Sequence, residues 1–519
     1  MPKLASRGTP PKRSAGKIKT LGELAGVLAR KKAQGKRVVH CHGVFDLLHP
    51  GHIRHFEQAR QLGDLLVVTV TPDRFVNKGS HRPAFPEALR AEAIAALGAV
   101  DFVAINVSPT AVTPIEQLRP DIYCKGGEYR TVEGDVKAAL LQEIDAVTAA
   151  GGRIEYTDDI TFSSSQLINS HFSVFPPETQ EWLKAFRSRR GLGQVLQLLE
   201  AASKLKVLVV GEAIIDEYVF CDGLGKSTKD PVLAFRYRST ETYGGGSVAV
   251  ANHLAGFCDH VSLTTLLGDS HRAEEFVRQA LLPNVQPQLI TWRGAPTIHK
   301  RRFVDTHTSA RMFELYLMQD EPLGEPDQKE LLKALKRSVR SYDAVIVADY
   351  GHGMLTPEVI SLLCKEAKFL AVNTQANAGN RGFNTISKYP RADYVCLAGH
   401  EIALETRMRH AAWQDLIVEV SKRVDCPRFT VTQGKDGSLH YAKEAGFTRV
   451  PALATTVKDR VGAGDAVLAV TSLLVAQGAP WDIVGLVGNV AGAQMVAELG
   501  NRVSVTRASL SRQIVSLMK

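Results

Sequence analysis

The feature that most constrains the fold of this chain is an alternation of short apolar runs with amphipathic stretches. RVVHCHGVF and LLVVTVTPD have the composition of buried strands, and HIRHFEQARQLG between them has helical spacing. The alternation starts again at KVLVVGEAIIDEY and continues to the C-terminus. Strands that alternate with helices are typical of βαβ units on parallel sheets, so the sequence predicts an α/β protein.

The length of 519 residues exceeds what one hydrophobic core usually serves, so we expect more than one domain. The pattern predicts a disordered basic tail over residues 1–19, an α/β domain over 20–171, a helical connector over 172–205 and a second α/β domain over 206–519. Within the second domain, PVLAFRYRS and HKRRFVDT alternate as strands do. They predict a small added β-sheet that forms a lid.

Composition narrows the class of protein. No run of about 18 apolar residues is present, which predicts no membrane span. The seven cysteines lie far apart without a CxxC pair, so we expect neither a disulfide framework nor a zinc site, and a reducing cytoplasm fits best. The net charge of +9 is spread widely, which favours small polyanionic substrates, or a charge that serves only solubility, over specific nucleic-acid binding.

The first candidate site is the run GVFDLLHPGH, where a strand turns into a helix. Ligands bind at the carboxyl edge of parallel sheets, and a helix N-terminus attracts phosphate. His49 and His52 can donate hydrogen bonds to triphosphate oxygens and stabilise the charge that develops at the α-phosphorus. The attacking group is then the substrate's own phosphate. The alternative is that His49 caps the helix and His52 is a surface residue.

The segment GVFDLLHPGHIRHFEQARQLGDLLVVTV resembles the signature region of cytidylyltransferase-like nucleotidyltransferases with a Rossmann-like fold. More narrowly, it is similar to the nucleotidyltransferase half of the bacterial bifunctional heptose enzymes. The resemblance extends over about residues 20–170, through NKGSHRP, DIYCKGGEY and FSSSQLIN. It implies that His49 and His52 are catalytic and that the nucleotide is bound by Gly43, Phe45, Asp46, Gly51, Lys78, Arg90, Lys125, Ser163, Ser164 and Ser165.

Each of these implied contacts has a simpler alternative. Lys78 and Lys125 could be solvated surface lysines, and the serine run could serve only as a helix cap. HPGH is also similar to the HIGH signature of class I aminoacyl-tRNA synthetases, but the sequence contains no KMSKS-like partner. The synthetase interpretation is therefore not favoured.

The second candidate site is GAGD, Gly462 to Asp465, directly before the helical run AVLAVTSLLVAQG. Backbone amides at a helix start can hold a transferring γ-phosphoryl group. A carboxylate beside them can take the proton of a substrate hydroxyl, which is the arrangement that a small-molecule kinase needs. Glycine-rich turns with an aspartate cap are common, so an ordinary helix start is the alternative.

The segment over residues 206–519 resembles the ribokinase-like sugar kinases, with ADYGHG and VTQGKDG at comparable places. The resemblance implies that Asp465 is the general base and that Asp216, Gly245 and Asn252 face the sugar. It assigns nucleotide binding to Gly434, Gly462, Ala463, Gly464 and Asn489, and a metal-linked role to Glu401. ATP and Mg²⁺ are the implied cofactors, with CTP as an alternative nucleotide for the first domain. A homodimer paired through the lid is expected by the same similarity.

Several departures from the heptose kinases weaken the case for an unchanged substrate. Their Asp-Pro-Lys triplet is replaced by Asn373-Thr374-Gln375, their Asn-x-x-Glu motif keeps only Glu401, and a sugar-site asparagine is replaced by Val248. The alternative for Glu401 is an exposed carboxylate at a helix start. In the familiar bifunctional enzyme the kinase comes first, so we also expect a reversed domain order here.

The two sites together predict a bifunctional sugar kinase and sugar-phosphate nucleotidyltransferase that makes a nucleotide-activated sugar, ADP-heptose being the most specific expectation, for surface polysaccharide. The first alternative is a cytidylyltransferase for a polyol or aminoalcohol phosphate with a divergent or inactive kinase domain. The second is a non-catalytic protein that binds nucleotides or RNA.

Overall fold

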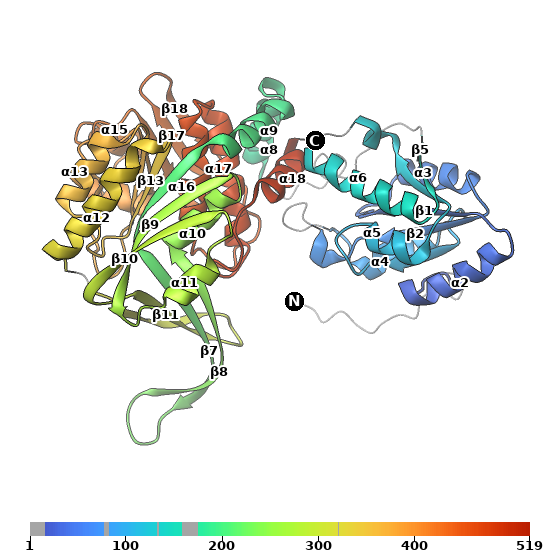
Figure 1. The fold of residues 1–519 in the computed structure, drawn as a ribbon, viewed down its shortest axis with the longest axis horizontal. Coiled ribbons are helices and arrows are strands. Elements are labelled where there is room, and N and C mark those ends of the chain that lie inside the picture. Colours follow the sequence, from blue (N-terminus) through green and yellow to red (C-terminus); the bar gives the residue numbers. More distant parts are fainter. Residues whose placement is uncertain (1–15, 77–82, 132–133, 158–174, 320, 519) are drawn as a thin grey trace. The chain divides into compact units, whose positions relative to one another are not determined.

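The computed structural model describes residues 16–76, 83–131, 134–157, 175–319 and 321–518. The chain divides into two compact units, one formed by residues up to 174 and the other by Phe175–Ile514. Both are α/β, as predicted (Figure 1). Each unit is described by itself below.

The first unit is built on a five-stranded parallel sheet in the order β3-β2-β1-β4-β5. Its strands are β1 (Val38–Gly43), β2 (Leu65–Val70), β3 (Phe102–Ile105), β4 (Ile122–Gly126) and β5 (Arg153–Thr157). Its helices are α2 (Leu21–Ala33), α3 (Pro50–Gln61), α4 (Glu87–Ala95), α5 (Val112–Leu118) and α6 (Gly134–Ala149), with short 3₁₀ turns η1 (Asp73–Phe75) and η2 (Gly127–Thr131). The strand order reverses between β1 and β4, which is the switch point where such sheets bind ligands.

The second unit is built on a nine-stranded sheet in the order β10-β9-β6-β13-β14-β15-β16-β17-β18. Its strands are β6 (Lys206–Gly211), β9 (His260–Ser270), β10 (Val285–Pro296), β13 (Ala344–Asp349), β14 (Leu370–Thr374), β15 (Tyr394–Ala398), β16 (Arg428–Thr432), β17 (Ser438–Ala442) and β18 (Gly446–Val450). The pairs from β10 to β16 are parallel, whereas β17 and β18 close one edge as antiparallel strands.

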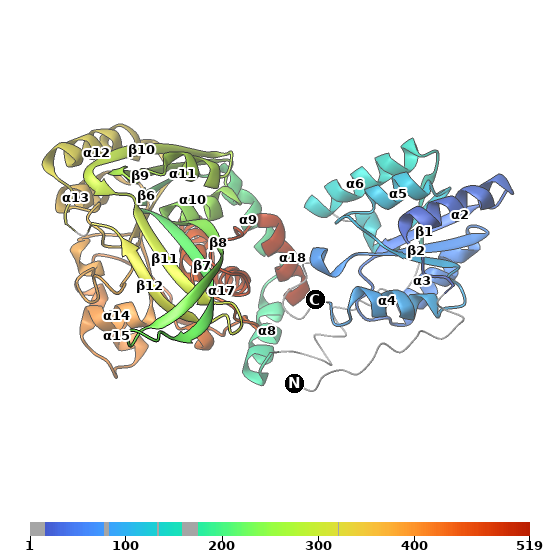
Figure 2. The same ribbon diagram turned by 90° about the horizontal axis from the view of Figure 1, so that it is seen from below.

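The predicted lid is a separate four-stranded sheet in the order β12-β11-β7-β8 (Figure 2). It consists of β7 (Ala213–Lys226), β8 (Leu233–Gly246), β11 (Ile298–Asp305) and β12 (Arg311–Leu317). β7 follows β6 after a single residue, so the main sheet and the lid are joined by a direct change of strand direction. Side chains on the inner face of the lid are therefore held at the carboxyl edge of the main sheet.

The second unit also contains helices. They are α8 (Pro177–Arg189), α9 (Leu192–Ala201), α10 (Ser247–Ala255), α11 (Glu274–Ala280), α12 (Glu325–Ser338), α13 (Pro357–Glu366), α14 (Gly399–Thr406), α15 (Trp413–Ser421), α16 (Ala463–Ala476) and α17 (Trp481–Val496), followed by α18 (Arg507–Met518) near the C-terminus. The predicted connector region contains α8 and α9. In α16 the residues from Asp465 to Val475 are all buried, which explains its apolar sequence.

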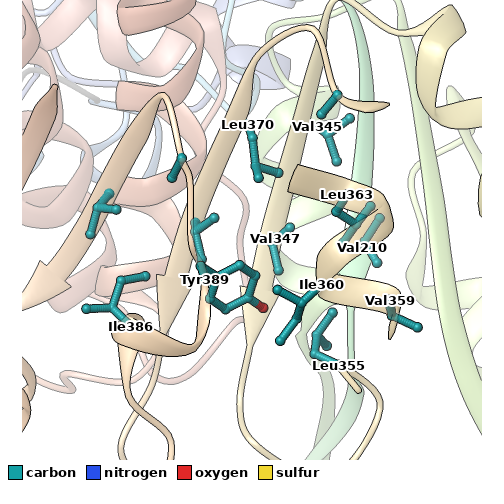
Figure 3. Close-up of a cluster of buried hydrophobic side chains, with 14 of the residues drawn as sticks. Val210, Val345, Val347, Leu355, Val359, Ile360, Leu363, Leu370, Ile386 and Tyr389 are labelled. Carbon is teal, nitrogen blue, oxygen red and sulfur yellow. The ribbon is translucent and has the colours of Figure 1, made fainter. Parts of the chain in front are cut away.

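The core of the second unit is a close-packed layer of branched aliphatic side chains between the sheet and α13 (Figure 3). Val345 and Val347 from β13 and Leu363 from α13 are fully buried there. Such interiors tolerate little change in volume, so the carboxyl ends of β13 and β14 are held rigidly. Within the described ranges, no helix combines the length and the apolar character needed to cross a membrane.

Candidate active sites

The first candidate site lies at the carboxyl end of β1, where the chain turns into α3. His49 occupies the N-cap position of α3 but its side chain makes no capping hydrogen bond, so it is not the simple helix cap considered as the alternative. The imidazole rings of His49 and His52 stack with their centroids 3.8 Å apart. The fold therefore brings the two predicted catalytic histidines together, at the start of the helix that contains Gly51.

Phe45 shapes this turn. Its φ of 47° lies in the left-handed region, which a bulky residue rarely adopts. Its ring packs edge-on against His52 at 5.3 Å, and a Cβ on Gly43 would lie 2.9 Å from the same ring. Gly43 is thus needed for Phe45 to fold back, and Phe45 in turn restricts the orientation of His52. This is a positioning role for two residues that were predicted to bind nucleotide.

Arg90 is buried and bonded to the protein itself. Its guanidinium donates to the carbonyl oxygens of Phe85 at 2.9 Å and Thr71 at 2.8 Å, to Asp73 at 2.6 Å, and also to the carbonyl oxygen of Val44. These bonds tie the turn after β1 to the end of β2. Asp46 is likewise buried and accepts a hydrogen bond from the Ala84 amide.

Lys125 is buried at the end of β4, the strand beside β1, so it is not the solvated surface lysine considered as the alternative. Its Nζ lies 2.9 Å from Glu143 Oε2, and that carboxylate also accepts a 2.9 Å hydrogen bond from the Tyr123 hydroxyl. Burial opposes its charge, but Tyr123, Tyr129 and Glu143 outweigh burial and raise the pKa of Lys125. The residue is a fixed positive charge at the switch point. Lys78, Ser163, Ser164 and Ser165 lie outside the described residues.

Two further histidines of β1 were not singled out from the sequence. His40 Nε2 and His42 Nδ1 both lie within hydrogen-bond distance of Thr69 Oγ1, at 2.7 and 2.8 Å. Burial lowers the pKa of His40 to about 3 and that of His42 well below its usual range, and the Lys125 charge acts in the same direction. Polar residues at every second position of a buried strand were the signal that could have identified them.

The second candidate site lies at the start of α16. Gly462 is its N-cap with a φ of 80°, and Asp465 is buried in its first turn. The Tyr350 hydroxyl donates a 2.7 Å hydrogen bond to Asp465 Oδ1. Burial raises the pKa of Asp465 to about 6, so this carboxylate is a stronger base than a solvated aspartate yet is ionised near neutral pH.

The predicted sugar-facing residue Asp216 lies on β7 of the lid. It forms a 2.5 Å ion pair with Arg302, and Asn501 donates to its second oxygen at 3.4 Å. A Cβ on Gly245 would lie 2.1 Å from Asp216 Oδ2, and one on Gly462 would lie 2.0 Å from Asn501 Oδ1. The structure thus brings Asp216, Gly245 and the start of α16 together through Asn501.

Two other predicted residues are bonded to main chain. Asn252 donates to the Ala280 carbonyl at 2.7 Å and accepts from the Leu282 amide at 2.9 Å. Asn489 donates to Ser438 Oγ at 3.0 Å and to the carbonyl groups of Val450 and Pro451 at the end of β18. Both geometries hold loops in place. Gly434 lies in the turn between β16 and β17 with a φ of 60°.

Glu401 is buried in the first turn of α14, so the alternative of an exposed carboxylate was wrong. Its two oxygens accept hydrogen bonds from the Ala398 amide at 2.7 Å and the Ala376 amide at 3.1 Å. Burial raises its pKa to about 7. The residue therefore joins the ends of β14 and β15. Asn373, one of the departures from the heptose kinases, donates to the Cys396 carbonyl at 2.7 Å and strengthens the same junction.

Comparison with known proteins separates the two units. Residues 204–507, more than half of the chain, match the model of the pfkB family carbohydrate kinases. The chain belongs to this family. Residues 40–170 match the model described as cytidylyltransferase-like, so a member of the pfkB family here carries a second, nucleotidyltransferase-like unit ahead of the kinase unit.

Two curated relatives carry the same name. "Bifunctional protein HldE" of Rhodopseudomonas palustris strain BisB18 is 27% identical over 322 residues, which are 61% of this chain and 65% of the relative. The protein of the same name from Geobacter sulfurreducens is 43% identical over 141 residues, 27% of either chain. The chain thus spans less than two thirds of the length of these relatives. The expected reversal of domain order finds no support in these matches.

Among solved structures, phosphofructokinase-2 from Escherichia coli is 15% identical with a TM-score of 0.49, covering 61% of this chain and all of that one. Ribokinase from Arabidopsis thaliana is 16% identical with a TM-score of 0.45, covering 61% of this chain and 99% of that one.

Lys300 and Arg302 are residues of the pfkB unit that the sequence analysis missed. Both are buried on β11, two positions apart and so on one face of the lid. Arg302 is paired with Asp216, and burial lowers the pKa of Lys300. The run HKRRFVD carries the signal, because a cation at alternate positions of a half-buried strand needs a counter-charge or an anionic ligand.

Proposed function

We propose that the protein is a bifunctional enzyme that phosphorylates a sugar in its pfkB unit and transfers a nucleotide to a sugar phosphate in its first unit. The product class is a nucleotide-activated heptose, ADP-heptose in the most specific form, for surface polysaccharide. The observation that carries the proposal is the pair of helix starts, one with stacked His49 and His52 and one with buried Asp465. The domain limits and the cytoplasmic location stay predictions.

In the kinase reaction, Asp465 takes the proton of the sugar hydroxyl as that oxygen attacks the γ-phosphorus, the bond from this phosphorus to the β,γ-bridging oxygen breaks, and ADP leaves. The Gly462–Gly464 backbone at the start of α16 holds the transferring phosphoryl oxygens. Asp216 accepts a hydrogen bond from another sugar hydroxyl, because Arg302 and Asn501 hold its carboxylate in one orientation. Lys300 supplies positive charge on the lid face of the sugar.

In the nucleotidyl transfer, the phosphate oxygen of the sugar phosphate attacks the α-phosphorus of the nucleoside triphosphate, and pyrophosphate leaves. His49 and His52 donate hydrogen bonds to the oxygens that gain charge. Lys125 adds a fixed positive charge at the end of β4, and the helix α3 directs its N-terminus to the same region. Gly43, Phe45, Asp46 and Arg90 keep the turn in its shape.

ATP with Mg²⁺ is the cofactor set that fits the pfkB unit, and CTP is the alternative nucleotide for the first unit. Mg²⁺ is usually held by one or two carboxylates together with phosphate oxygens and waters. Each oxygen of Glu401 accepts one amide hydrogen bond and has a second lone pair, so this carboxylate suits a water-mediated metal contact. The ion would neutralise the β- and γ-phosphate oxygens.

The proposed assembly is a homodimer through the lid. Phe313, Leu315 and Leu317 on β12 alternate along the strand and are exposed by 49%, 51% and 37%. Alternate residues share one face, so the lid presents an apolar strip that a second copy would cover.

The second candidate is a cytidylyltransferase for a polyol or aminoalcohol phosphate, with a kinase unit of changed substrate. Asn373 and Gln375 favour it, because neutral groups replace an acid and a base, and the Asn373 amide is bonded to a carbonyl.

The deciding experiment measures pyrophosphate release with ATP or CTP, each combined with heptose 1-phosphate, glycerol 3-phosphate or buffer alone. If pyrophosphate is released only with ATP and heptose 1-phosphate, the heptose function is supported. Release with CTP and glycerol 3-phosphate supports the second candidate. His52→Ala should lose most of the activity, whereas Glu57→Ala on the exposed side of α3 should keep it. Normal turnover in His52→Ala would contradict the mechanism.

A further inference from the structure

The Tyr350 side chain is a buried group of the ADYGHG run that has no part in the proposed kinase reaction. It follows β13 directly, and its hydroxyl lies 2.7 Å from Asp465 Oδ1. With a phenol fixed on Oδ1, the carboxylate cannot rotate freely and Oδ2 is left for the substrate. We infer that Tyr350 is a positioning residue for phosphoryl transfer, which orients Asp465 and is itself fixed by a clamp of four polar side chains, three of them buried. This inference rests on the proposed kinase activity.

The clamp consists of Glu212, Asn377, Asn380 and Asn384. Glu212 accepts hydrogen bonds from the Tyr350 amide at 3.0 Å and the His352 amide at 3.1 Å. Asn377 and Asn380 donate to the Tyr350 carbonyl oxygen at 2.8 and 2.6 Å. The backbone amide and carbonyl of Tyr350 are therefore both hydrogen-bonded to side chains. An ordinary turn does not require specific polar residues for this.

The neighbouring residues complete the clamp. Asn384 donates to the Asp349 carbonyl at 2.9 Å, and Gly351 adopts a φ of 69°. A Cβ on Gly351 would lie 2.3 Å from Asn380 Nδ2. The segment 377–384, which contains the asparagines, is therefore in direct contact with the turn at Tyr350 and Gly351. The three asparagines belong to the segment that follows the Asn373-Thr374-Gln375 replacement. That segment therefore supports the turn that holds the base.

Several charged or titratable groups act on Asp465 besides Tyr350. Asp216 faces it from β7 and Lys300 from β11, and it interacts electrostatically with Glu401 of α14 and Cys396 of β15. Burial and Asp216 raise the pKa of Asp465, while the Tyr350 hydrogen bond and Lys300 lower it. Removing only the hydroxyl leaves the other groups in place, so the pKa of Asp465 must rise.

The test compares Tyr350→Phe with Tyr394→Phe in the full chain. Tyr394 is a matched control, because its buried hydroxyl also donates to α16, at 2.8 Å, but to Thr471 and not to a carboxylate. Titration of ¹³C-labelled aspartate, with the Asp465 signal assigned from Asp465→Asn, should show the pKa of Asp465 raised by about one unit in Tyr350→Phe. It should be unchanged in Tyr394→Phe. Equal titration in Tyr350→Phe and the unmodified protein would overturn the inference.

The kinase reaction gives the second readout. The acid limb of kcat/KM should move to higher pH by the same interval in Tyr350→Phe, with kcat reduced about tenfold, and Asn380→Ala should give a smaller shift of the same sign. A loss of kcat without any shift of the limb would overturn the positioning role. If the unmodified protein phosphorylates no sugar, the proposed function fails, while the carboxylate titration still decides whether Tyr350 controls Asp465.

Discussion

Tyr218 and Asp459 join the lid to the loop before α16. The Tyr218 hydroxyl, on β7, donates a 2.9 Å hydrogen bond to Asp459 Oδ2, and the same carboxylate accepts the amides of Val461 and Gly500, each at 3.0 Å. Arg311 of β12 pairs with its other oxygen. One buried carboxylate thus holds two lid strands and the loop that leads to Asp465 in a single arrangement.

Replacing Asp459 should therefore destabilise the second unit. Asp459→Asn puts an NH₂ group against the donors that the carboxylate satisfied, and it leaves Arg311 without its partner. We expect a loss of about 3 kcal/mol in the free energy of unfolding, because Asp459 is buried and its substitution leaves several donors without a well-matched acceptor. All four tryptophans, Trp182, Trp292, Trp413 and Trp481, lie in this unit, so their fluorescence during urea unfolding measures it.

Asp222→Asn is the control for that measurement. Asp222 also lies on β7 and also pairs with an arginine, Arg238, but that partner is about half exposed. Exposed pairs contribute little, so this variant should lose less than about 1 kcal/mol. Equal losses in the two variants would mean that Asp459 is not the joint between lid and loop.

The sequence predicted the order of strands and helices because period-2 and period-3.6 patterns are local properties. It also predicted the two helix starts, since a buried strand, a glycine and a helix follow one another directly. It could not predict which polar side chains form hydrogen bonds within the protein instead of with a ligand. Arg90 and Asn252 have the chemistry of ligand contacts, yet their partners are backbone groups of distant segments. Tyr350 lies in the ADYGHG run, but its contact with Asp465 had no local signal, because the two residues are 115 positions apart.

Lys125 and Glu143 form a buried pair. Replacing Lys125 alone should destabilise the first unit more than replacing both residues. Lys125→Met takes the cation from Glu143 and leaves the carboxylate hydrogen-bonded to the Tyr123 hydroxyl and the Ala111 amide, which should cost about 3 kcal/mol or more. In Lys125→Met/Glu143→Gln no buried charge remains unpaired, so hydrogen exchange of β4 should return toward that of the unmodified chain. If the double variant is stable but releases no pyrophosphate, the Lys125 charge serves the reaction. Restored activity would leave Lys125 with a structural role only.

Gly351→Ala should reduce both stability and kinase activity. The residue has a φ of 69°, and a Cβ would lie 2.3 Å from Asn380 Nδ2 and 2.7 Å from Asn384 Cγ. We expect a loss of about 3 kcal/mol, since strain and a steric clash add. Gly382→Ala is the matched control, because Gly382 has a φ of 84° but nothing within 4 Å of its Cβ position. It should lose only about 1 kcal/mol. Similar losses of stability in the two variants would show that the clamp side chains move away from the added Cβ at little cost.

The stability of the second unit should depend on pH through His440. Burial lowers the pKa of this imidazole from 6.5 to about 3, while Thr430 Oγ1 and Ser438 Oγ lie within 2.8 Å of its two nitrogens. Below pH 6.5 the unfolded chain binds a proton that the folded unit does not, so stability falls as the pH falls toward 3.

His440→Gln removes this contribution and leaves the other titrating groups unchanged. The stability of the unmodified chain relative to the variant should therefore drop by about 1.4 kcal/mol per pH unit in this range. Urea unfolding of both chains, followed by tryptophan fluorescence at several pH values, measures that difference. A difference that stays constant with pH would mean that His440 becomes protonated in the folded unit.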